Sequence, residues 1–187
     1  MARVIDTKDR IVRAAEDVVI RDGVAHLTLE AAAAEAGLSK GGVLYHFPSR
    51  AALVAAMVDR FVVSFDADLD RYGAYGGKPG DFVRAYVEAT LAPTVEPGDV
   101  RERRLGSALL AGVASDPELL SPLRERFVAW QSSVESDGLD PAIATIIRYA
   151  ADGLWLCDIF ELAPVRDDHR RVVGDEMRAL IERATTS

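Results

Sequence analysis

The chain has 187 residues, almost half of them apolar, with a formal net charge of −8 and a single cysteine, Cys157. This composition excludes a disordered chain and an internal disulfide framework, and the length is sufficient for one or two domains with a hydrophobic core. Few aromatic residues and many alanines and leucines favour packed helices, so we expect an all-α protein.

The negative charge is unevenly distributed along the chain. Up to Arg60 there are eight Lys or Arg and eight Asp or Glu, whereas beyond it there are fourteen against twenty-two. No Asp or Glu lies between Glu35 and Asp59. A polyanion would therefore be tolerated in this window and not over the acidic remainder.

The N-terminal sequence MARVIDTKDR lacks the apolar run of a secretion signal. No uninterrupted apolar segment approaches the ~20 residues needed to span a bilayer. We therefore expect a cytoplasmic protein with no membrane partner.

The first expected helix begins after Asp6 or Thr7, either of which can cap it, and ends at about Asp22 before Gly23. Its inner face, at helical spacing, consists of Ile11, Ala14, Ala15, Val18 and Val19.

The stretch from Thr28 to Arg50 has the punctuation of a helix-turn-helix. Thr28 can cap an alanine-rich helix, Gly37 can close it in the left-handed conformation, and Ser39 can cap a second helix that ends before Pro48.

On the second of these helices, Val43, Leu44 and Phe47 are expected to face inward. The outward face then carries hydroxyls, cationic groups and two glycines: Ser39, Lys40, Gly41, Gly42, Tyr45 and His46. Adjacent glycines cost a helix about 1 kcal/mol each relative to alanine, so they indicate close approach of a partner such as DNA phosphate. The alternative is a solvated helical hairpin that binds nothing.

The first fifty residues resemble the DNA-binding domain of TetR-type bacterial transcriptional repressors. The matching residues are Arg10, Ile11, Ala14, Ala15, Gly23, Thr28, Glu30, Gly37, Ser39, Lys40, Gly41, Tyr45, His46, Phe47, Pro48 and Ser49. The chain departs from the family at Gly42, where threonine is common, and at Leu44, where tyrosine is frequent. The operator sequence therefore cannot be inherited from a relative.

The resemblance implies a homodimer whose helix-turn-helix domains bind two half-sites of double-stranded operator DNA. It also implies a switch in which the helix after Ser49 tilts. Phosphate-holding roles then fall to Thr28, Lys40, Tyr45, His46 and Arg50.

Beyond this connecting helix, which the GAYGGKPG segment ends, five further helices are expected, at about 80–95, 100–114, 117–136, 141–162 and 168–185. Their start signals are Asp99, Asp116-Pro117, Ser121-Pro122, Asp140-Pro141 and Asp167.

Aromatic and apolar residues of this second part make a small-molecule effector site plausible, although most of them must belong to the core. The candidates are Phe61, Phe65, Tyr86, Leu109, Phe127, Trp130, Tyr149, Asp152 and Trp155. Asp152 either pairs with Arg148 inside the protein or orients a polar group of the effector.

The last two expected helices are too apolar for a monomer surface, and Gly153 indicates that another helix passes closely. We expect them to form a two-fold, four-helix interface. Its candidate residues are Ile146, Ala150, Gly153, Leu154, Cys157, Val173, Met177, Leu180 and Ile181.

No catalytic, metal or cofactor motif is recognisable, because the three histidines are scattered and no phosphate-binding loop is present. The leading hypothesis is a ligand-responsive homodimeric repressor, with a DNA-binding domain at 1–49 and a ligand-binding and dimerisation domain at 50–187. The alternative is an all-α small-molecule-binding protein or enzyme in which the helix-turn-helix is only structural.

Overall fold

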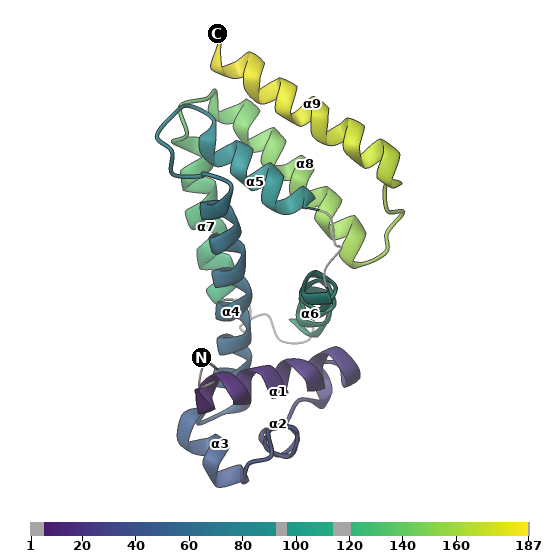
Figure 1. Cartoon of the computed structure of the whole chain (residues 1–187). Coiled ribbons are helices and arrows are strands. Elements are labelled where there is room, and N and C mark those ends of the chain that lie inside the picture. Colours follow the sequence, from purple (N-terminus) through teal and green to yellow (C-terminus); the bar gives the residue numbers. More distant parts are fainter. Residues whose placement is uncertain (1–5, 93–96, 114–120, 187) are drawn as a thin grey trace, which may run out of the picture. The chain divides into compact units, whose positions relative to one another are not determined.

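The computed structural model describes residues 6–92, 97–113 and 121–186, which form helices and no strand. The expected all-α class is confirmed. In chain order the elements are α1 (Thr7–Asp22), the 3-10 helix η1 (Val24–His26), α2 (Leu29–Ala36), α3 (Lys40–His46), α4 (Arg50–Arg71), α5 (Asp81–Leu91), α6 (Pro97–Val113), α7 (Ser121–Glu135), α8 (Pro141–Ile159) and α9 (Asp167–Thr185) (Figure 1). None of these described helices is long and apolar enough to cross a membrane.

The chain divides into two compact units. The N-terminal unit comprises residues 1–61 and 96–124, and the C-terminal unit comprises 62–95 and 125–187. The sequence-based division after residue 49 follows chain order, whereas the packing does not. The difference arises because α6 packs against α1 and η1, and because α4 contributes residues to both units.

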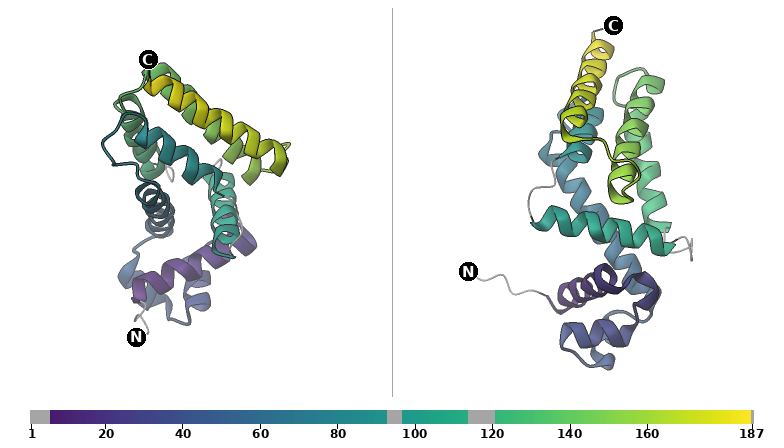
Figure 2. Two further views of the ribbon diagram at one scale, coloured as in Figure 1. Left: turned by 45° about the horizontal axis from the view of Figure 1, so that its top comes forward. Right: turned by 90° about the vertical axis from the view of Figure 1, so that its right-hand side faces the viewer.

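In the N-terminal unit, α1 is the central helix and contacts α2, η1 and α6 (Figure 2). Its expected inner face is confirmed, since Ile11, Ala15 and Val19 are fully buried. Removing such side chains from water is the main favourable contribution to the stability of this small core. The same core also contains Leu27, Ala32, Val43, Phe47, Leu53 and Met57.

Local capping interactions shape the helix-turn-helix as the sequence predicts. Thr28 Oγ1 accepts a hydrogen bond from Ala31 N at 2.9 Å, and Ser39 Oγ accepts one from Gly42 N at 3.1 Å. Gly37 lies between the two helices in the left-handed conformation, with φ 64°. Each cap satisfies a backbone group that the helix end leaves without a partner, so the turn is encoded within about a dozen residues.

The other helix starts follow the sequence signals less uniformly. Ser49 and Asp140 cap α4 and α8 through their side chains, but the Asp6 side chain makes no capping bond to α1. Helix α6 begins at Pro97, so Asp99 lies inside its first turn rather than before it. The Asp116-Pro117 pair lies outside the described residues.

A buried carboxylate ties three helices of the N-terminal unit together. Glu16 on α1 is only 1% exposed, and its two oxygens are paired with Arg101 Nη1 of α6 at 2.6 Å and with Arg60 Nε of α4 at 3.4 Å. Arg101 also pairs with Asp17 at 2.8 Å. A buried charge is tolerated only when it is paired and hydrogen-bonded in this way.

In the C-terminal unit, α5 packs against α8 and α9, and α8 also contacts α9 (Figure 1). Asp137, which precedes α8, accepts hydrogen bonds from Phe82 N at 3.0 Å and Val83 N at 2.9 Å. It thereby caps α5 from a distant part of the sequence. A Cβ at Gly80 would lie 3.0 Å from Ile181 Cγ2, so a glycine is needed where α9 passes the start of α5.

Candidate nucleic-acid interface and effector site

Helix α3 buries one side and exposes the other. Val43 and Phe47 are buried as expected, but Leu44 is 40% exposed, so its predicted inward position is wrong. A helix of seven residues has too narrow a buried side for three large apolar residues. The exposed surface includes Ser39, Lys40, Gly41 and Tyr45, of which Tyr45 is 86% exposed.

The two glycines of α3 are not required by close packing against any described part of the chain. A Cβ at Gly41 would meet only Ser39 Oγ, at 3.9 Å, and one at Gly42 would meet the same atom at 3.4 Å and Leu38 Cβ at 4.0 Å. These are ordinary van der Waals distances. The fold therefore does not require glycine at these two positions, although glycine is unfavourable in a helix. The missing side chains leave the backbone of α3 open to an external partner.

Lys40 is paired in the free protein. Its Nζ lies 2.5 Å from Glu30 Oε1, and both side chains are more than half exposed. The hydrogen bond from Lys40 lowers the pKa of Glu30. An exposed ion pair of this kind contributes little to stability, so a phosphate can replace Glu30 as the partner of Lys40.

Arg50 has a structural role that the sequence did not indicate. Its Nε donates to Leu27 O at 3.0 Å and its Nη2 donates to Val24 O at 2.8 Å. The half-buried guanidinium thus holds the segment that joins η1 to α2. These two bonds were not predictable from the sequence, because both acceptors lie more than twenty residues away.

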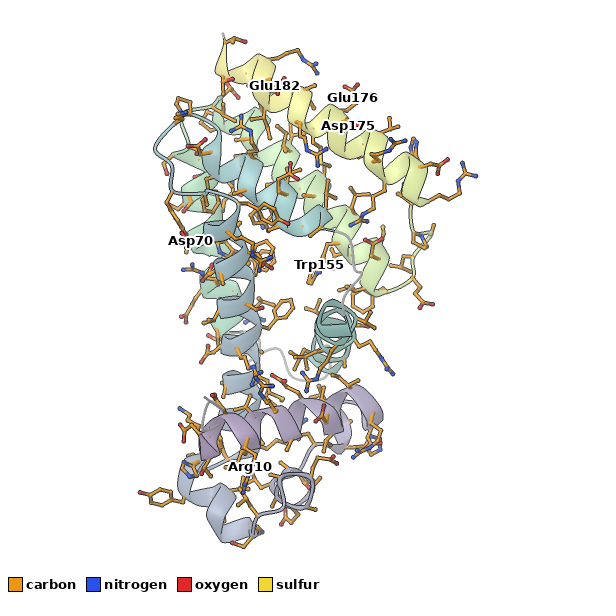
Figure 3. The ribbon with its side chains drawn as sticks, viewed as in Figure 1. Arg10, Asp70, Trp155, Asp175, Glu176 and Glu182 are labelled. Carbon is orange, nitrogen blue, oxygen red and sulfur yellow. The ribbon has the colours of Figure 1, made fainter. Side chains whose placement is uncertain are left out.

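The remaining predicted contact residues keep polar groups at the surface. Thr28 and Ser39 use their hydroxyl oxygens as acceptors in the caps, which leaves each O–H able to donate to a phosphate. His46 is half-buried and packs edge-to-face on Tyr45, with 5.1 Å between ring centroids. Arg10, which the sequence did not single out as a contact, is exposed on the side of α1 that faces α2 and α3 (Figure 3).

Four candidate effector residues come together in the C-terminal unit. Phe65 of α4 lies 5.2 Å from Tyr86 of α5 and 4.9 Å from Trp130 of α7, and Phe127 lies 5.1 Å from Trp130, all between ring centroids. Tyr86 and Trp130 are buried, whereas Phe65 and Phe127 are half-buried. We call these four residues the aromatic cluster.

A polar network adjoins the aromatic cluster. Tyr86 Oη donates to Asp152 Oδ1 at 2.6 Å, and Arg148 Nη2 pairs with Asp152 Oδ2 at 3.0 Å, which confirms the internal pair. Arg148 Nη1 also donates to Gln131 Oε1 at 2.7 Å. Burial raises the pKa values of Asp152 and Tyr86 above their usual ranges.

This network is incompletely satisfied. Arg148 is 5% exposed, and its Nε is a buried nitrogen that has no hydrogen-bond partner among the described residues. A buried donor without an acceptor costs about 1–3 kcal/mol. An oxygen from outside the chain would remove this cost.

Three other predicted effector residues are not part of the aromatic cluster. Phe61 and Leu109 belong to the N-terminal unit. Tyr149 is 60% exposed, and the Arg148 guanidinium lies 5.0 Å from the centre of its ring. Trp155 is half-buried and projects from α8 on the side away from α9 (Figure 3). Asp152 and Trp155 are three positions apart and therefore share one face of α8.

The outer face of α8 is apolar and exposed. It includes Ile146, Tyr149, Ala150, Leu156 and Phe160, while Leu154 and Cys157 are half-buried. A Cβ at Gly153 would meet nothing within 4 Å, so none of the described helices of this chain is the close helix expected there. This set, with Gly153, is called the α8 face below.

On α9 the predicted interface residues divide into two groups. Leu180 is exposed and Val173 is half-buried, and Val172, which adjoins Val173, is also exposed. Met177 and Ile181 are buried at 4% and 0% exposure within their own chain, so their assignment to an interface is wrong. They face the C-terminal unit's own core, as the contact between Ile181 and Gly80 indicates.

Within the described residues, no group of three His, Cys, Asp or Glu side chains could hold a metal ion.

Residues 11–57 match the sequence model of bacterial regulatory proteins of the tetR family, and residues 80–182 match that of the tetracyclin repressor-like C-terminal domain. The comparison with curated proteins gave no match.

Solved structures share the fold at low sequence identity. A putative TetR-family transcriptional regulator from Rhodococcus sp. is 19% identical, with a TM-score of 0.75 over 96% of this chain and 98% of that chain. A TetR-family member from Streptomyces coelicolor A3 is 23% identical, with a TM-score of 0.69 over 92% and 98%. NalD, the secondary repressor of the MexAB-OprM multidrug efflux pump in Pseudomonas aeruginosa, is 19% identical, with a TM-score of 0.66 over 92% and 94%.

Proposed function

Because the chain belongs to the TetR family of bacterial regulatory proteins and is thus a DNA-binding transcriptional regulator, we propose that it is a homodimeric repressor. A small, mostly apolar effector releases it from its operator. The observation that carries this proposal is the exposed face of α3, which holds Lys40, Tyr45 and two glycines that the fold does not require.

DNA binding through α3 is supported by charge as well as by shape. The residues from 36 to 58 include no Asp or Glu, although the whole chain has a net charge of −8. Phosphate contacts by Lys40, Tyr45, His46 and the hydroxyls of Thr28 and Ser39 would position the helix on the duplex. The exposed guanidinium of Arg10 takes the place that the sequence suggested for Arg50.

Dimerisation is supported by the α8 face. Exposed large apolar side chains at Ile146, Tyr149 and Phe160 follow one another at helical spacing, and Val172 and Leu180 of α9 are also exposed. Contiguous apolar surface of this kind marks an interaction site. A homodimer formed through α8 and α9 would supply two copies of α3, as an operator with two half-sites about one DNA turn apart requires.

The aromatic cluster and the network of Tyr86, Asp152 and Arg148 form the proposed effector site. Phe65 and Phe127 are half-buried, so an apolar ring can reach the cluster, and Arg148 Nε has no acceptor among the described residues. The effector we expect is therefore an apolar molecule with one hydrogen-bond-accepting oxygen. The name of NalD as the secondary repressor of a multidrug efflux pump supports the repressor role.

Two steps test the proposal. First, the full-length protein is used to select duplexes from a random-sequence library, and the selected sequences should share a two-fold symmetric motif. Second, compounds are titrated while the fluorescence of Trp130 and Trp155 is followed. A compound that is an effector lowers operator affinity by the same factor by which the operator lowers the affinity of the compound, because the coupling free energy is reciprocal.

The absence of any enriched motif would refute operator binding. Compounds that bind near the tryptophans and leave operator affinity unchanged would refute the effector switch alone. A duplex affinity that does not depend on salt would instead favour a helix-turn-helix that is only structural.

A further inference from the structure

Helix α3, the proposed DNA-binding helix, has few side chains that can discriminate between bases by hydrogen bonding. Its sequence, KGGVLYH, contains no Arg, Asn, Gln, Asp or Glu, which make most of the two-point contacts with base edges in the major groove. Lys40 is its one side chain of that kind, and in the free protein it is paired with Glu30 at 2.5 Å. Base recognition by α3 must therefore depend largely on another kind of contact.

Leu44 is placed to supply an apolar contact. It is 40% exposed and lies three positions after Gly41 and four after Lys40, so the three residues are neighbours on the helix surface. Because Gly41 has no side chain, the flank of Leu44 toward the start of α3 is uncovered. A single exposed leucine is unremarkable on most surfaces, but this one adjoins the bare backbone where α3 would approach a base pair.

We propose that Leu44 reads the C5-methyl group of a thymine in each operator half-site. Thymine alone among the four bases presents a methyl group in the major groove, and apolar side chains recognise it by contact. The inference rests on the proposed operator binding and adds to it the residue that discriminates bases and the base that it selects.

The test replaces single thymines by deoxyuracil in the duplex selected by the protein, which removes one methyl group and keeps every base-pairing atom. One contacted thymine should account for about a fourfold loss of affinity, the equivalent of one buried methylene, and both half-sites together for about fifteenfold. Thymines elsewhere in the duplex should be replaceable with less than about a twofold effect.

The protein variant Leu44→Ala completes the cycle. Alanine and leucine are both good helix formers, and the residue is exposed, so the fold of α3 is retained. With this variant the ratio of thymine to deoxyuracil affinities should fall to about one, because the double cycle isolates the contact between the methyl group and the side chain. Val63→Ala, at an exposed valine of α4 in the C-terminal unit, is the matched control and should keep the full ratio.

The outcomes separate this inference from the proposed function. Failure to select any motif would overturn operator binding itself. A selected operator whose affinity is unchanged by every deoxyuracil, or whose methyl effect persists in Leu44→Ala, would overturn the assignment of Leu44 and leave operator binding intact.

Discussion

The two units each contain a buried ionic cluster, and the clusters differ in completeness. In the N-terminal unit both oxygens of the Glu16 carboxylate are paired with arginines, one from α4 and one from α6. In the C-terminal unit Arg148 is equally buried, yet its Nε has no partner in the described structure, and burial raises the pKa of its partner Asp152.

This difference indicates which parts of the molecule satisfy their buried polar groups and cover their apolar surface without a ligand or a second copy of the chain. The N-terminal unit satisfies the buried charge of Glu16 and leaves one surface of α3 exposed, where we propose that DNA binds. The C-terminal unit leaves a buried donor inside and the apolar α8 face outside, both of which are costly without a ligand or a second copy. We therefore expect substitutions at the Glu16 cluster to affect folding, those on the exposed surface of α3 to affect DNA binding, and those at the α8 face to affect association.

The largest effect is expected at the α8 face. Ile146→Asp would bury a carboxylate in the dimer interface, at a cost of about 4 kcal/mol, which weakens dimerisation about 1,000-fold. In sedimentation velocity at micromolar concentration, the Ile146→Asp variant should then be a monomer and the wild type a dimer. Val128→Asp, at an equally exposed position on α7, is the control and should remain a dimer. If the wild type were a monomer at this concentration, the proposed dimerisation through the α8 face would be wrong.

The next largest effect is expected at the Glu16 cluster. Arg101→Ala leaves the buried Glu16 with Arg60 alone and should lower the free energy of unfolding by about 3 kcal/mol, as is usual for a broken buried pair. Urea denaturation followed by circular dichroism measures this loss. Arg104→Ala, at an exposed position on the same helix, should change stability by less than about 0.5 kcal/mol. Equal losses in the two variants would mean that the cluster has no special role.

Within the N-terminal unit, we expect Arg50 to contribute mainly to stability and Lys40 mainly to DNA binding. Arg50→Ala removes two hydrogen bonds to backbone carbonyls and should cost about 2 kcal/mol of stability with little change in the salt dependence of DNA binding. Lys40→Ala should leave stability within about 0.5 kcal/mol of wild type and reduce the salt slope by ~1. If Arg50→Ala instead reduced the salt slope and left stability unchanged, Arg50 would be a phosphate contact, as the sequence analysis predicts.

The smallest effect is expected in the polar network of the C-terminal unit. Tyr86→Phe removes the hydrogen bond that lowers the pKa of Asp152, so this pKa should rise further, and stability should fall by about 1.5 kcal/mol. The pKa of Asp152 in the folded protein lies above the usual 3.8 of the unfolded chain. The contribution of Asp152 to stability therefore decreases as the pH rises from 3.8 through the pKa of the folded protein. Carboxyl NMR titration of Asp152 measures the shift, and Tyr72→Phe, at an exposed tyrosine, should leave it unchanged.

The sequence predicted features whose causes are local. The caps at Thr28, Ser39 and Asp140 and the turn at Gly37 depend on neighbours within a few residues, and the structure confirms them. The Arg148–Asp152 pair was accessible for the same reason, since its members are one helical turn apart.

Features that depend on distant parts of the chain were not predictable. Glu16 finds Arg101 more than eighty positions away, and no periodicity signals such a pair. On α9 the apolar stripe is wide enough to serve two partners, so the sequence could not separate Met177 and Ile181, which face their own core, from Leu180, which is exposed.

The most direct test of DNA binding through α3 is the affinity of the full-length protein for its selected duplex and for a scrambled duplex, measured by fluorescence anisotropy between 50 and 200 mM salt. We predict that log K falls linearly with log salt, with a slope of about −0.9 for each phosphate neutralised, and that the selected duplex stays at least ~1,000-fold preferred. Equal affinity for the two duplexes, or an affinity that is independent of salt, would contradict the account.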